Sequence, residues 1–333
     1  MELAPSQTAS SLLLSARPPH RFSSTCAAID QLLTPAHPPQ GPMRADKAEE
    51  AGLGEGAVLE LLGPPGVGKT RTALGFMLAE RFQEDGGEVL VVGARSYRHL
   101  VARGADEPAL QTLKDLSVLR CSRRRPRSTP RITDVSNCAT PARILADRLP
   151  FADEPDIVRN ILSGIRYRRI DSAWMLFAFF NSLETWLAAH PKVKLIVIDS
   201  LSAHFRQTID SPTRIYIADT IRNVLSTVCS ANRVSVIITN QMSLKLFGPD
   251  NRPTNWSRDA EALLVPTISD QCLPFDVDVS RVLLYYSEEG ERLAHLVSAP
   301  MLTQARSAAF TMDLLGPCDY PEPSDEMIAD PPS

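Results

Sequence analysis

Residues 58–70 read V-L-E-L-L-G-P-P-G-V-G-K-T, an apolar run that turns directly into the spacing G-x-x-x-x-G-K-T. Between a strand and a helix, this spacing is typical of a phosphate-binding loop, or P-loop. Glycines at these places let successive backbone N–H groups converge on a phosphate that a side chain would block. The stretch therefore predicts a nucleotide site at the carboxyl end of a buried strand.

The loop also supplies the polar side chains that a magnesium nucleotide needs. Lys69 is expected to reach the β- and γ-phosphates, and the Thr70 hydroxyl to bind Mg²⁺. A helix predicted over Lys69–Phe82 adds the positive end of its dipole. A plain glycine and proline turn is the alternative, but motif, strand and helix together favour a site for ATP and Mg²⁺. The expected nucleotide-binding residues are Gly63, Pro64, Pro65, Gly66, Val67, Gly68, Lys69, Thr70 and Asp199.

Two later strands are predicted to bring polar residues to the same edge of the sheet. Residues 194–200 read K-L-I-V-I-D-S, and Asp199 ends the aliphatic run. By itself this is a buried strand with a capping acid, but after a P-loop it predicts a Walker B strand whose Asp199 binds Mg²⁺ together with Thr70. Gln241 ends the strand expected at 234–241. It is either a γ-phosphate contact or an amide bonded to the backbone.

The order of the predicted elements indicates an α/β fold. A strand expected at Glu88–Gly93 follows the P-loop helix, which predicts a mostly parallel, twisted sheet flanked by helices, with right-handed crossovers. The apolar helix over Ala173–Ala189 is too short to span a bilayer, so we expect it in the core. Short turns between strands at 282–286, 292–297 and 308–312 predict antiparallel strands at the C-terminal end.

Composition divides the 333 residues into one core and several irregular segments. The net charge of −4 argues against a protein that coats nucleic acid by bulk electrostatics. The expected divisions are a disordered tail at 1–24, an ATPase core at 25–313 and a disordered tail at 314–333. Within the core we expect a flexible insertion at 34–56, an arginine-rich loop at 120–131 and a long loop at 242–275.

Two basic or polar segments admit more than one interpretation. Residues 120–131 contain several arginines and no acid, which suits a solvated loop, a nuclear-import signal or a nucleic-acid contact. Residues 1–22 are rich in Ser and Pro, which favours a disordered tail over a mitochondrial transit peptide.

Further stretches share their order and spacing with a known family. They are A-I-D-Q-L-L at 28–33, K-V-K at 192–194, L-I-V-I-D-S at 195–200, A-N-R at 231–233, N-Q-M-S-L-K at 240–245 and A-L-L-V-P at 262–266. With the P-loop, they resemble the RecA-like eukaryotic strand-exchange recombinases, and within that family its C paralogue, over about residues 25–313. The resemblance implies a RecA-like P-loop ATPase core. It also implies a nuclear protein of homologous recombination that joins other recombinase paralogues and the recombinase in a heteromeric complex.

The chain departs from that family at one catalytic position. The family's strand after the P-loop helix usually ends beside a glutamate that activates the attacking water, whereas this chain runs V-G-A-R-S at 92–96. The absence of a carboxylate at Ala94 predicts ATP binding with weak or absent hydrolysis. By resemblance, 205–212 and 242–275 correspond to DNA-facing loops, but their basic residues are balanced by acids. Contact with single-stranded DNA is therefore expected to be weak.

These observations leave three functional hypotheses. The first is an ATP-binding mediator subunit that assists assembly of the strand-exchange filament in homologous-recombination DNA repair. The second is an active DNA-dependent ATPase that itself forms filaments and exchanges strands, and the third is a P-loop signalling ATPase unrelated to DNA. Position 94 and the near-neutral loops favour the first. The expected location is the nucleus, with a minor mitochondrial pool as an alternative, and no membrane association is expected.

Overall fold

The computed structural model describes most of the expected ATPase core. The described residues are 20–34, 51–83, 86–93, 133–134, 160–205, 210–229, 231–250, 252, 254, 261–266, 279–299, 306–313 and 315–320. Ala94 and the arginine-rich loop at 120–131 lie outside these ranges, as do 1–19, 35–50 and 321–333. The expectations for those segments stay predictions.

The described elements alternate between strands and helices along most of the chain. The strands are β1 (Arg21–Phe22), β2 (Leu53–Gly54), β3 (Val58–Leu62), β4 (Glu88–Gly93), β5 (Thr133–Asp134), β6 (Ile165–Arg169), β7 (Val193–Asp199), β8 (Ser235–Thr239), β9 (Met242–Phe247), β10 (Glu261–Pro266), β11 (Val279–Tyr286), β12 (Arg292–Ser298), β13 (Arg306–Met312) and β14 (Pro317–Cys318). The helices are α2 (Ala27–Leu33), α3 (Lys69–Phe82), α8 (Ala173–Ala189), α9 (Leu201–His204) and α10 (Ser211–Val224), and α10 continues into a π-helical turn, Leu225–Cys229.

A ten-stranded sheet organises the described residues, in the order β14-β13-β12-β11-β3-β8-β7-β4-β6-β5. From β11 to β6 in this order, neighbouring strands run parallel. The strands β12, β13 and β14 add antiparallel pairs at one edge, and β5 adds an antiparallel pair at the other. The predicted mostly parallel sheet with an antiparallel C-terminal end is therefore confirmed.

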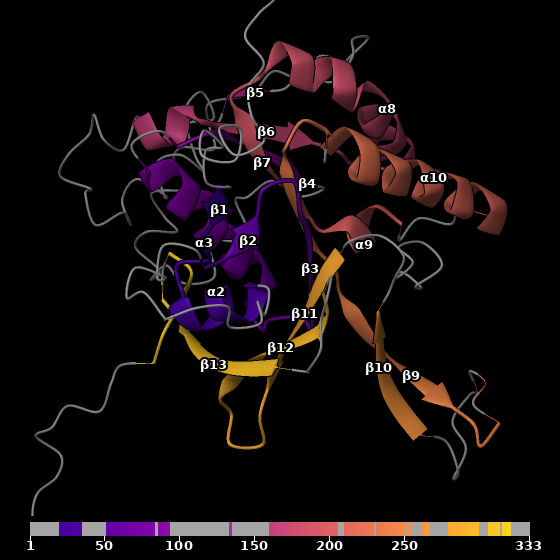
Figure 1. Ribbon diagram of the computed structural model, residues 1–333. Helices are drawn as coiled ribbons and strands as arrows, with labels where there is room; N and C mark the ends of the chain where they lie inside the picture. Colours follow the sequence, from indigo (N-terminus) through magenta and orange to yellow (C-terminus); the bar gives the residue numbers. More distant parts are fainter. Residues whose placement is uncertain are drawn as a thin grey trace, which may run out of the picture.

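Each face of the central strands has its own apolar core, because successive side chains of a strand point to opposite faces. In β7, Leu195 and Val197 join the core that includes α2 and α3, whereas Ile196 and Ile198 join the core that includes α8 and α10. These two sets of helices lie on opposite sides of the sheet (Figure 1). Burial of both faces explains why the central strands β4, β7 and β8 are nearly continuous aliphatic runs.

Helix α8 is the apolar core helix that the sequence predicts. Ser172 caps its first turn, since its side chain accepts a hydrogen bond from the Met175 N–H at 3.2 Å. Phe179, Phe180 and Leu183 are buried on its inner face. Across the described parts of the chain, no helix combines the length and apolar character needed to cross a membrane.

The core begins earlier than composition suggests. Residues 20–24, expected in the disordered tail 1–24, include β1, which pairs antiparallel with β2 and buries Phe22. Leu53 on strand β2 is also buried. The flexible insertion expected at 34–56 therefore does not extend over residues 51–56. The apolar area of these two side chains stabilises the pairing, although the surrounding polar and proline-rich sequence concealed them.

The core also ends later than expected. Residues 315–320, assigned from sequence to a disordered tail at 314–333, include β14, which pairs with β13. The Asp319 carboxylate accepts hydrogen bonds from the N–H groups of Ala27 and Ala28, at 2.9 and 2.8 Å, and so caps the start of α2. An acid at this position also interacts favourably with the helix dipole. The last described segment is thereby fastened to the first helix.

Removal of the Asp319 cap should destabilise the fold in a pH-dependent way. We expect Asp319→Ala to lower the free energy of unfolding by about 0.5–2 kcal/mol near pH 7, because two helix N–H groups lose their acceptor. Although burial opposes its charge, hydrogen bonds from Ala28, Ala27 and Cys26 lower the pKa of Asp319 below its ordinary value. The stabilisation is therefore complete above the unfolded-state pKa of about 4 and is lost as the pH falls through the folded-state pKa.

Urea unfolding of both proteins at several pH values measures this difference. Asp319→Asn, which retains one acceptor oxygen, should lose less stability than Asp319→Ala. Equal stability of Asp319→Ala and the wild-type protein at pH 7 would contradict the capping role.

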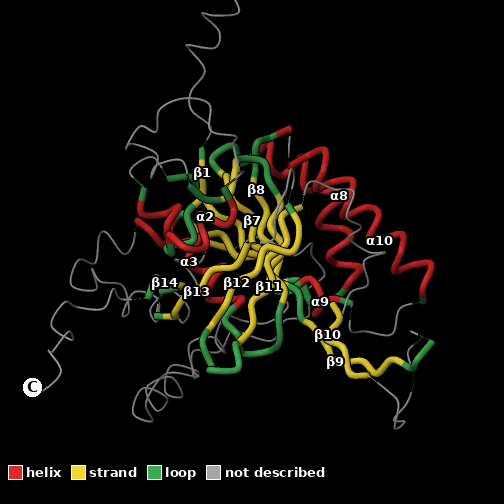
Figure 2. Tube along the Cα trace, turned by 60° about the horizontal axis from the view of Figure 1, so that its bottom comes forward, coloured by secondary structure: helices red, strands yellow, loops and turns green. Residues whose placement is uncertain are grey.

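The long loop expected at 242–275 contains a hairpin, so that expectation is wrong for its two strands. Strands β9 and β10 pair antiparallel, and both views show them projecting away from the main sheet (Figures 1 and 2). Leu244 and Leu264 are cross-strand partners and are 65% and 51% exposed. The short apolar runs L-K-L-F and A-L-L-V were the sequence signal that the prolines around them masked.

Candidate nucleotide-binding site

The P-loop backbone adopts conformations that only its glycines permit. Gly66 and Gly68 have φ angles of 87° and 118°, in the left-handed region that favours glycine. A Cβ at Gly68 would lie 2.5 Å from the terminal methyl carbon of Met312, and one at Gly63 would lie 2.3 Å from the carbonyl oxygen of Leu284. Residues of strands β11 and β13 therefore lie so close to the loop that they leave no room for a side chain at Gly63 or Gly68. Helix α3 begins directly after Gly68, so its first N–H groups lie at the loop.

Lys69 is buried beneath this loop and is only 7% exposed. Its ammonium group donates hydrogen bonds to the carbonyl oxygens of Gly63 and Pro64, at 2.7 and 2.8 Å. Burial lowers the pKa of Lys69 to about 8, although the nearby charge of Asp199 acts in the opposite direction. Neutral carbonyl groups compensate a desolvated charge only partly, so the position suits an anion such as a phosphate.

Thr70 and Asp199 meet at the carboxyl edge of the sheet, as the sequence predicts. Thr70, in the first turn of α3, donates through Oγ1 to Oδ1 of Asp199 at 3.2 Å. Thr239, at the end of β8, donates to the same oxygen. The register of the parallel strands β7 and β8 sets Asp199 opposite Thr239, which explains why this third residue joins the pair.

The oxygen atoms around Asp199 fit a magnesium ion. The pKa of Asp199 is raised, because the effect of burial exceeds that of the hydrogen bonds from Thr239 and Thr70 and of the charge of Lys69, which lower it. A divalent cation would offset the cost of burying the carboxylate, and Mg²⁺ is typically held by one or two protein oxygens together with water and phosphate oxygens. Thr70 and Asp199 would hold the ion here. Once bound, Mg²⁺ would supply charge neutralisation for the phosphates.

Gln241 lies at the same edge, on the segment that leaves β8. Its backbone N–H donates to Oγ of Ser202, at 3.3 Å. The next residue, Met242, donates its N–H to the carbonyl oxygen of Gly63 at 3.2 Å. The backbone around Gln241 is thus joined to the P-loop, whereas its contact with a γ-phosphate stays a prediction. Position 94, where the family carries its glutamate, lies outside the described residues.

Sequence reasoning missed a buried polar network beside the P-loop. Glu60 on β3 and Arg281 on β11 are adjacent in the parallel register and form an ion pair at 2.7 Å. Their side chains are only 6% and 3% exposed. Asn240 donates through Nδ2 to the other carboxylate oxygen of Glu60, at 2.5 Å. The sequence did contain a signal for this network, namely one acid and one arginine within apolar strands, Glu60 and Arg281. Buried charges of this kind need partners of opposite charge.

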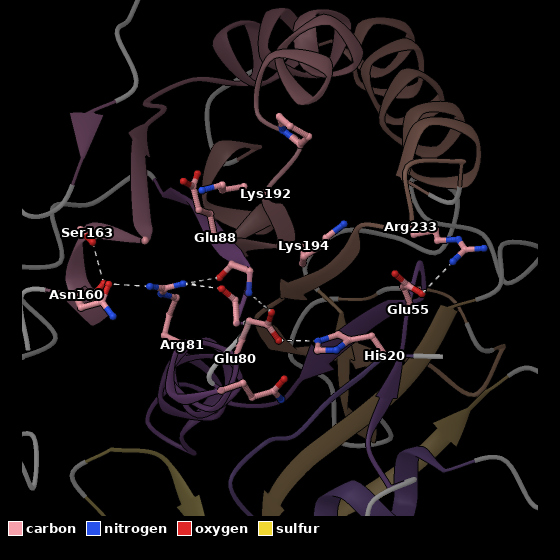
Figure 3. A pocket seen from close by; sticks show the side chains of 15 residues that line it. His20, Glu55, Glu80, Arg81, Glu88, Asn160, Ser163, Lys192, Lys194 and Arg233 are labelled. Carbon is pink, nitrogen blue, oxygen red and sulfur yellow. Dashed lines mark hydrogen bonds and ion pairs between the residues drawn. The ribbon is translucent and has the colours of Figure 1, made fainter. Parts of the chain in front are cut away.

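A polar hollow lies at the opposite, amino-terminal edge of the central strands (Figure 3). Glu80 accepts a hydrogen bond from the Gly87 N–H at 2.6 Å and lies 2.8 Å from a ring nitrogen of His20. Arg81 donates to the carbonyl oxygens of Gly86 and Gly87, both at 2.9 Å. Glu80 is buried and Arg81 is half-buried. Their hydrogen bonds to the backbone of Gly86 and Gly87 hold the turn after α3, which gives both side chains a structural role.

Sequence comparison finds a curated protein that is similar to part of this chain. The DNA repair protein RAD51 homolog 3 of Cricetulus griseus is 28% identical to this chain over 144 residues, which make up 43% of the chain and 36% of that protein. The chain is similar to a RAD51-type protein. The similarity spans little more than a third of that relative's length. No protein-family model matches the sequence.

The RAD51-type similarity and the sheet topology agree with each other. A P-loop after β3 and a mostly parallel sheet between two sets of helices form the predicted RecA-like α/β core, which is confirmed. A fold supports many activities, so function has to be argued from the residues of the site.

Proposed function

We propose that this chain is an ATP- and Mg²⁺-binding mediator subunit of homologous-recombination DNA repair, which assists assembly of the strand-exchange filament in the nucleus. The observation that carries the proposal is the contact between Thr70 and Asp199 beside a P-loop with a buried Lys69. The similarity to DNA repair protein RAD51 homolog 3 supports the repair assignment. Its partners are other recombinase paralogues and the recombinase, and among the paralogues it corresponds to C.

The P-loop contacts indicate how a nucleotide would affect the rest of the chain. The Gly63 carbonyl oxygen accepts hydrogen bonds from both the Lys69 ammonium and the Met242 N–H. On nucleotide binding, Lys69 would exchange this carbonyl for phosphate oxygens, which compensate its charge better. Because Met242 begins β9, the exchange changes the bonding at the base of the hairpin. Nucleotide occupancy is thus linked to a surface that projects from the core.

The β9–β10 hairpin suits contact with protein better than contact with phosphates. Leu244, Leu263 and Leu264 are among the exposed large apolar residues of the chain. Beyond β9, Arg252 lies 3.8 Å from Asp250, so part of its charge is already compensated. Weak phosphate neutralisation gives weak binding to single-stranded DNA. These features favour a role in assembly over a role in strand exchange.

Hydrolysis separates a mediator subunit from an active recombinase. We expect the purified chain to bind Mg·ATP but to hydrolyse it about 10²–10⁴-fold more slowly than an enzyme with a positioned base, since Ala94 stands where the family carries a glutamate. Single-turnover measurements on the chain alone and in its native complex give the rate. Ala94→Glu should raise the rate, and Ala94→Gln, which has similar size but no base, should not.

Two outcomes would contradict the proposal. Rapid hydrolysis by the unmodified chain alone would favour the active ATPase. The native complex is obtained by affinity purification of the tagged chain from cells, and its subunits provide the second test. We expect recombinase-family subunits, whereas a complex made of signalling proteins would refute the repair assignment.

A further inference from the structure

The buried network around Glu60 connects the P-loop strand with the first turn of α9. One carboxylate oxygen of Glu60 accepts from Nε of Arg281 at 2.7 Å, and the other accepts from Nδ2 of Asn240 at 2.5 Å. Asn240 is 1% exposed, and its Oδ1 accepts from the Ser202 N–H at 3.1 Å. None of these side chains belongs to the set expected to touch a nucleotide.

The partners of Asn240 fix the orientation of its amide group. The carboxylate of Glu60 can only accept hydrogen bonds, and the backbone N–H of Ser202 can only donate one. The amide NH₂ must therefore face Glu60, and the amide oxygen must face Ser202. A rotated amide would lose both bonds in a buried place, where unsatisfied polar groups are costly. Asn240 is thus held in one orientation between β3 and α9.

Ser202 also bonds to the backbone of Gln241, the candidate γ-phosphate contact. Its N–H donates to Oγ of Ser202, the residue whose own N–H is bonded to Asn240. On the other side, the Met242 N–H donates to the Gly63 carbonyl oxygen. Figures 1 and 2 place α9 next to the base of the hairpin that follows Gln241. Ser202 therefore joins the Asn240 side chain to the backbone N–H of Gln241.

We propose that Asn240, anchored by Glu60 and Arg281, is a positioning residue that directs Gln241 toward the γ-phosphate of ATP. The inference rests on the proposed nucleotide function and adds to it the source of discrimination between ATP and ADP. Most P-loop contacts reach phosphates that both nucleotides share, so they do not distinguish ATP from ADP. Only contacts with the γ-phosphate contribute to the difference in affinity.

The substitution Asn240→Asp tests this role with little change in size. The new side chain keeps an acceptor for the Ser202 N–H but places an oxygen against the Glu60 carboxylate, which cannot donate. We expect the ratio of the ADP Kd to the ATP Kd to fall about tenfold, with the ADP Kd within about threefold of wild type. Calorimetric titration with Mg²⁺ and each nucleotide measures both constants. A merely structural defect would weaken both nucleotides alike.

A second substitution should restore the discrimination. In the protein with both Asn240→Asp and Glu60→Gln, the new glutamine can donate to the new aspartate while its oxygen accepts from Arg281, so the hydrogen bond is kept with its direction reversed. We expect the Kd ratio to return to within about threefold of wild type. Asn232→Asp, the same change at an exposed asparagine, is the matched control and should leave the ratio unaltered.

The outcomes separate this role from the nucleotide function itself. If the wild-type chain binds both nucleotides and Asn240→Asp leaves their ratio unaltered, the positioning role is wrong and the nucleotide function stands. Equal loss of both nucleotides that Glu60→Gln does not repair also overturns the positioning role. A wild-type chain that binds neither nucleotide would refute the P-loop assignment and this role with it.

Discussion

The Lys69→Ala chain should bind ATP at least about 30-fold more weakly than the wild-type chain, and up to several thousand-fold more weakly, because a partly buried contact between opposite charges is worth about 2–5 kcal/mol when one partner is lost. The ammonium group of Lys69 lies under the P-loop and is held by the carbonyl oxygens of Gly63 and Pro64. Its removal takes away a charge but little apolar packing, so the fold should persist. Calorimetric titration with Mg·ATP measures the affinity.

Lys192→Ala provides the matched control for this experiment. Lys192 is an exposed lysine at the opposite edge of the sheet, beside the polar hollow, so its loss should not affect ATP affinity. Thermal unfolding should show that both variants remain folded. An ATP affinity of Lys69→Ala equal to that of the control would refute the P-loop assignment.

The low pKa of Lys69 adds a pH dependence to ATP binding. Burial lowers this pKa to about 8, and a bound triphosphate would raise it by favouring the charged form. ATP affinity should therefore be nearly constant below pH 8 and fall by up to about tenfold per pH unit above it, because binding then requires uptake of a proton. In the Lys69→Ala chain this decline should be absent.

Replacing Glu60 with leucine should lower the free energy of unfolding by about 3–5 kcal/mol, because one partner of a buried ion pair is removed while the other stays. Glu60 and Arg281 are paired at 2.7 Å in adjacent strands, and Asn240 donates to the same carboxylate. The substitution removes the carboxylate that accepts hydrogen bonds from Arg281 and from Asn240. Urea unfolding followed by circular dichroism measures the change.

A double variant distinguishes a lost partner from lost packing. The chain with both Glu60→Leu and Arg281→Leu should recover most of the stability, since no buried charge is left without its counter-charge. Asp219→Leu breaks a surface pair with Arg222 on α10 and should cost only about 0.5 kcal/mol or less. If Glu60→Leu costs no more than Asp219→Leu, the buried pair does not contribute as expected.

Local chemistry explains which elements the sequence predicted well. The strand Val58–Leu62, the helix Lys69–Phe82 and the strand Glu88–Gly93 have the predicted bounds. Each is specified by its own residues, through an aliphatic run, a glycine spacing or a helical period. Thr70 and Asp199 were expected at the same edge of the sheet for a related reason, since parallel strands bring their carboxyl ends to one edge. Their side chains are hydrogen-bonded there, and their binding of Mg²⁺ stays a prediction.

Long-range pairing explains the elements that the sequence did not predict. At one end of the core, Phe22 is buried where β1 pairs with β2. At the other end, Asp319 caps α2, a helix that begins 292 residues earlier in the chain. The strands of the hairpin likewise stabilise each other across a stretch of irregular sequence. Composition reports the average character of a segment, whereas one buried side chain or one cap can decide whether that segment is ordered.

Spacing and periodicity are properties of neighbouring residues, so they were enough to predict the P-loop, the acid at the end of β7 and the alternation of strands and helices. The pairing of Glu60 with Arg281 and the hydrogen bond from Asn240 to Glu60 are visible only in the folded chain. Their meeting depends on β11 lying beside β3 in a register that sets Arg281 next to Glu60. Strand order and register follow from the packing of the whole sheet against helices on both faces, and no short stretch of sequence encodes that packing.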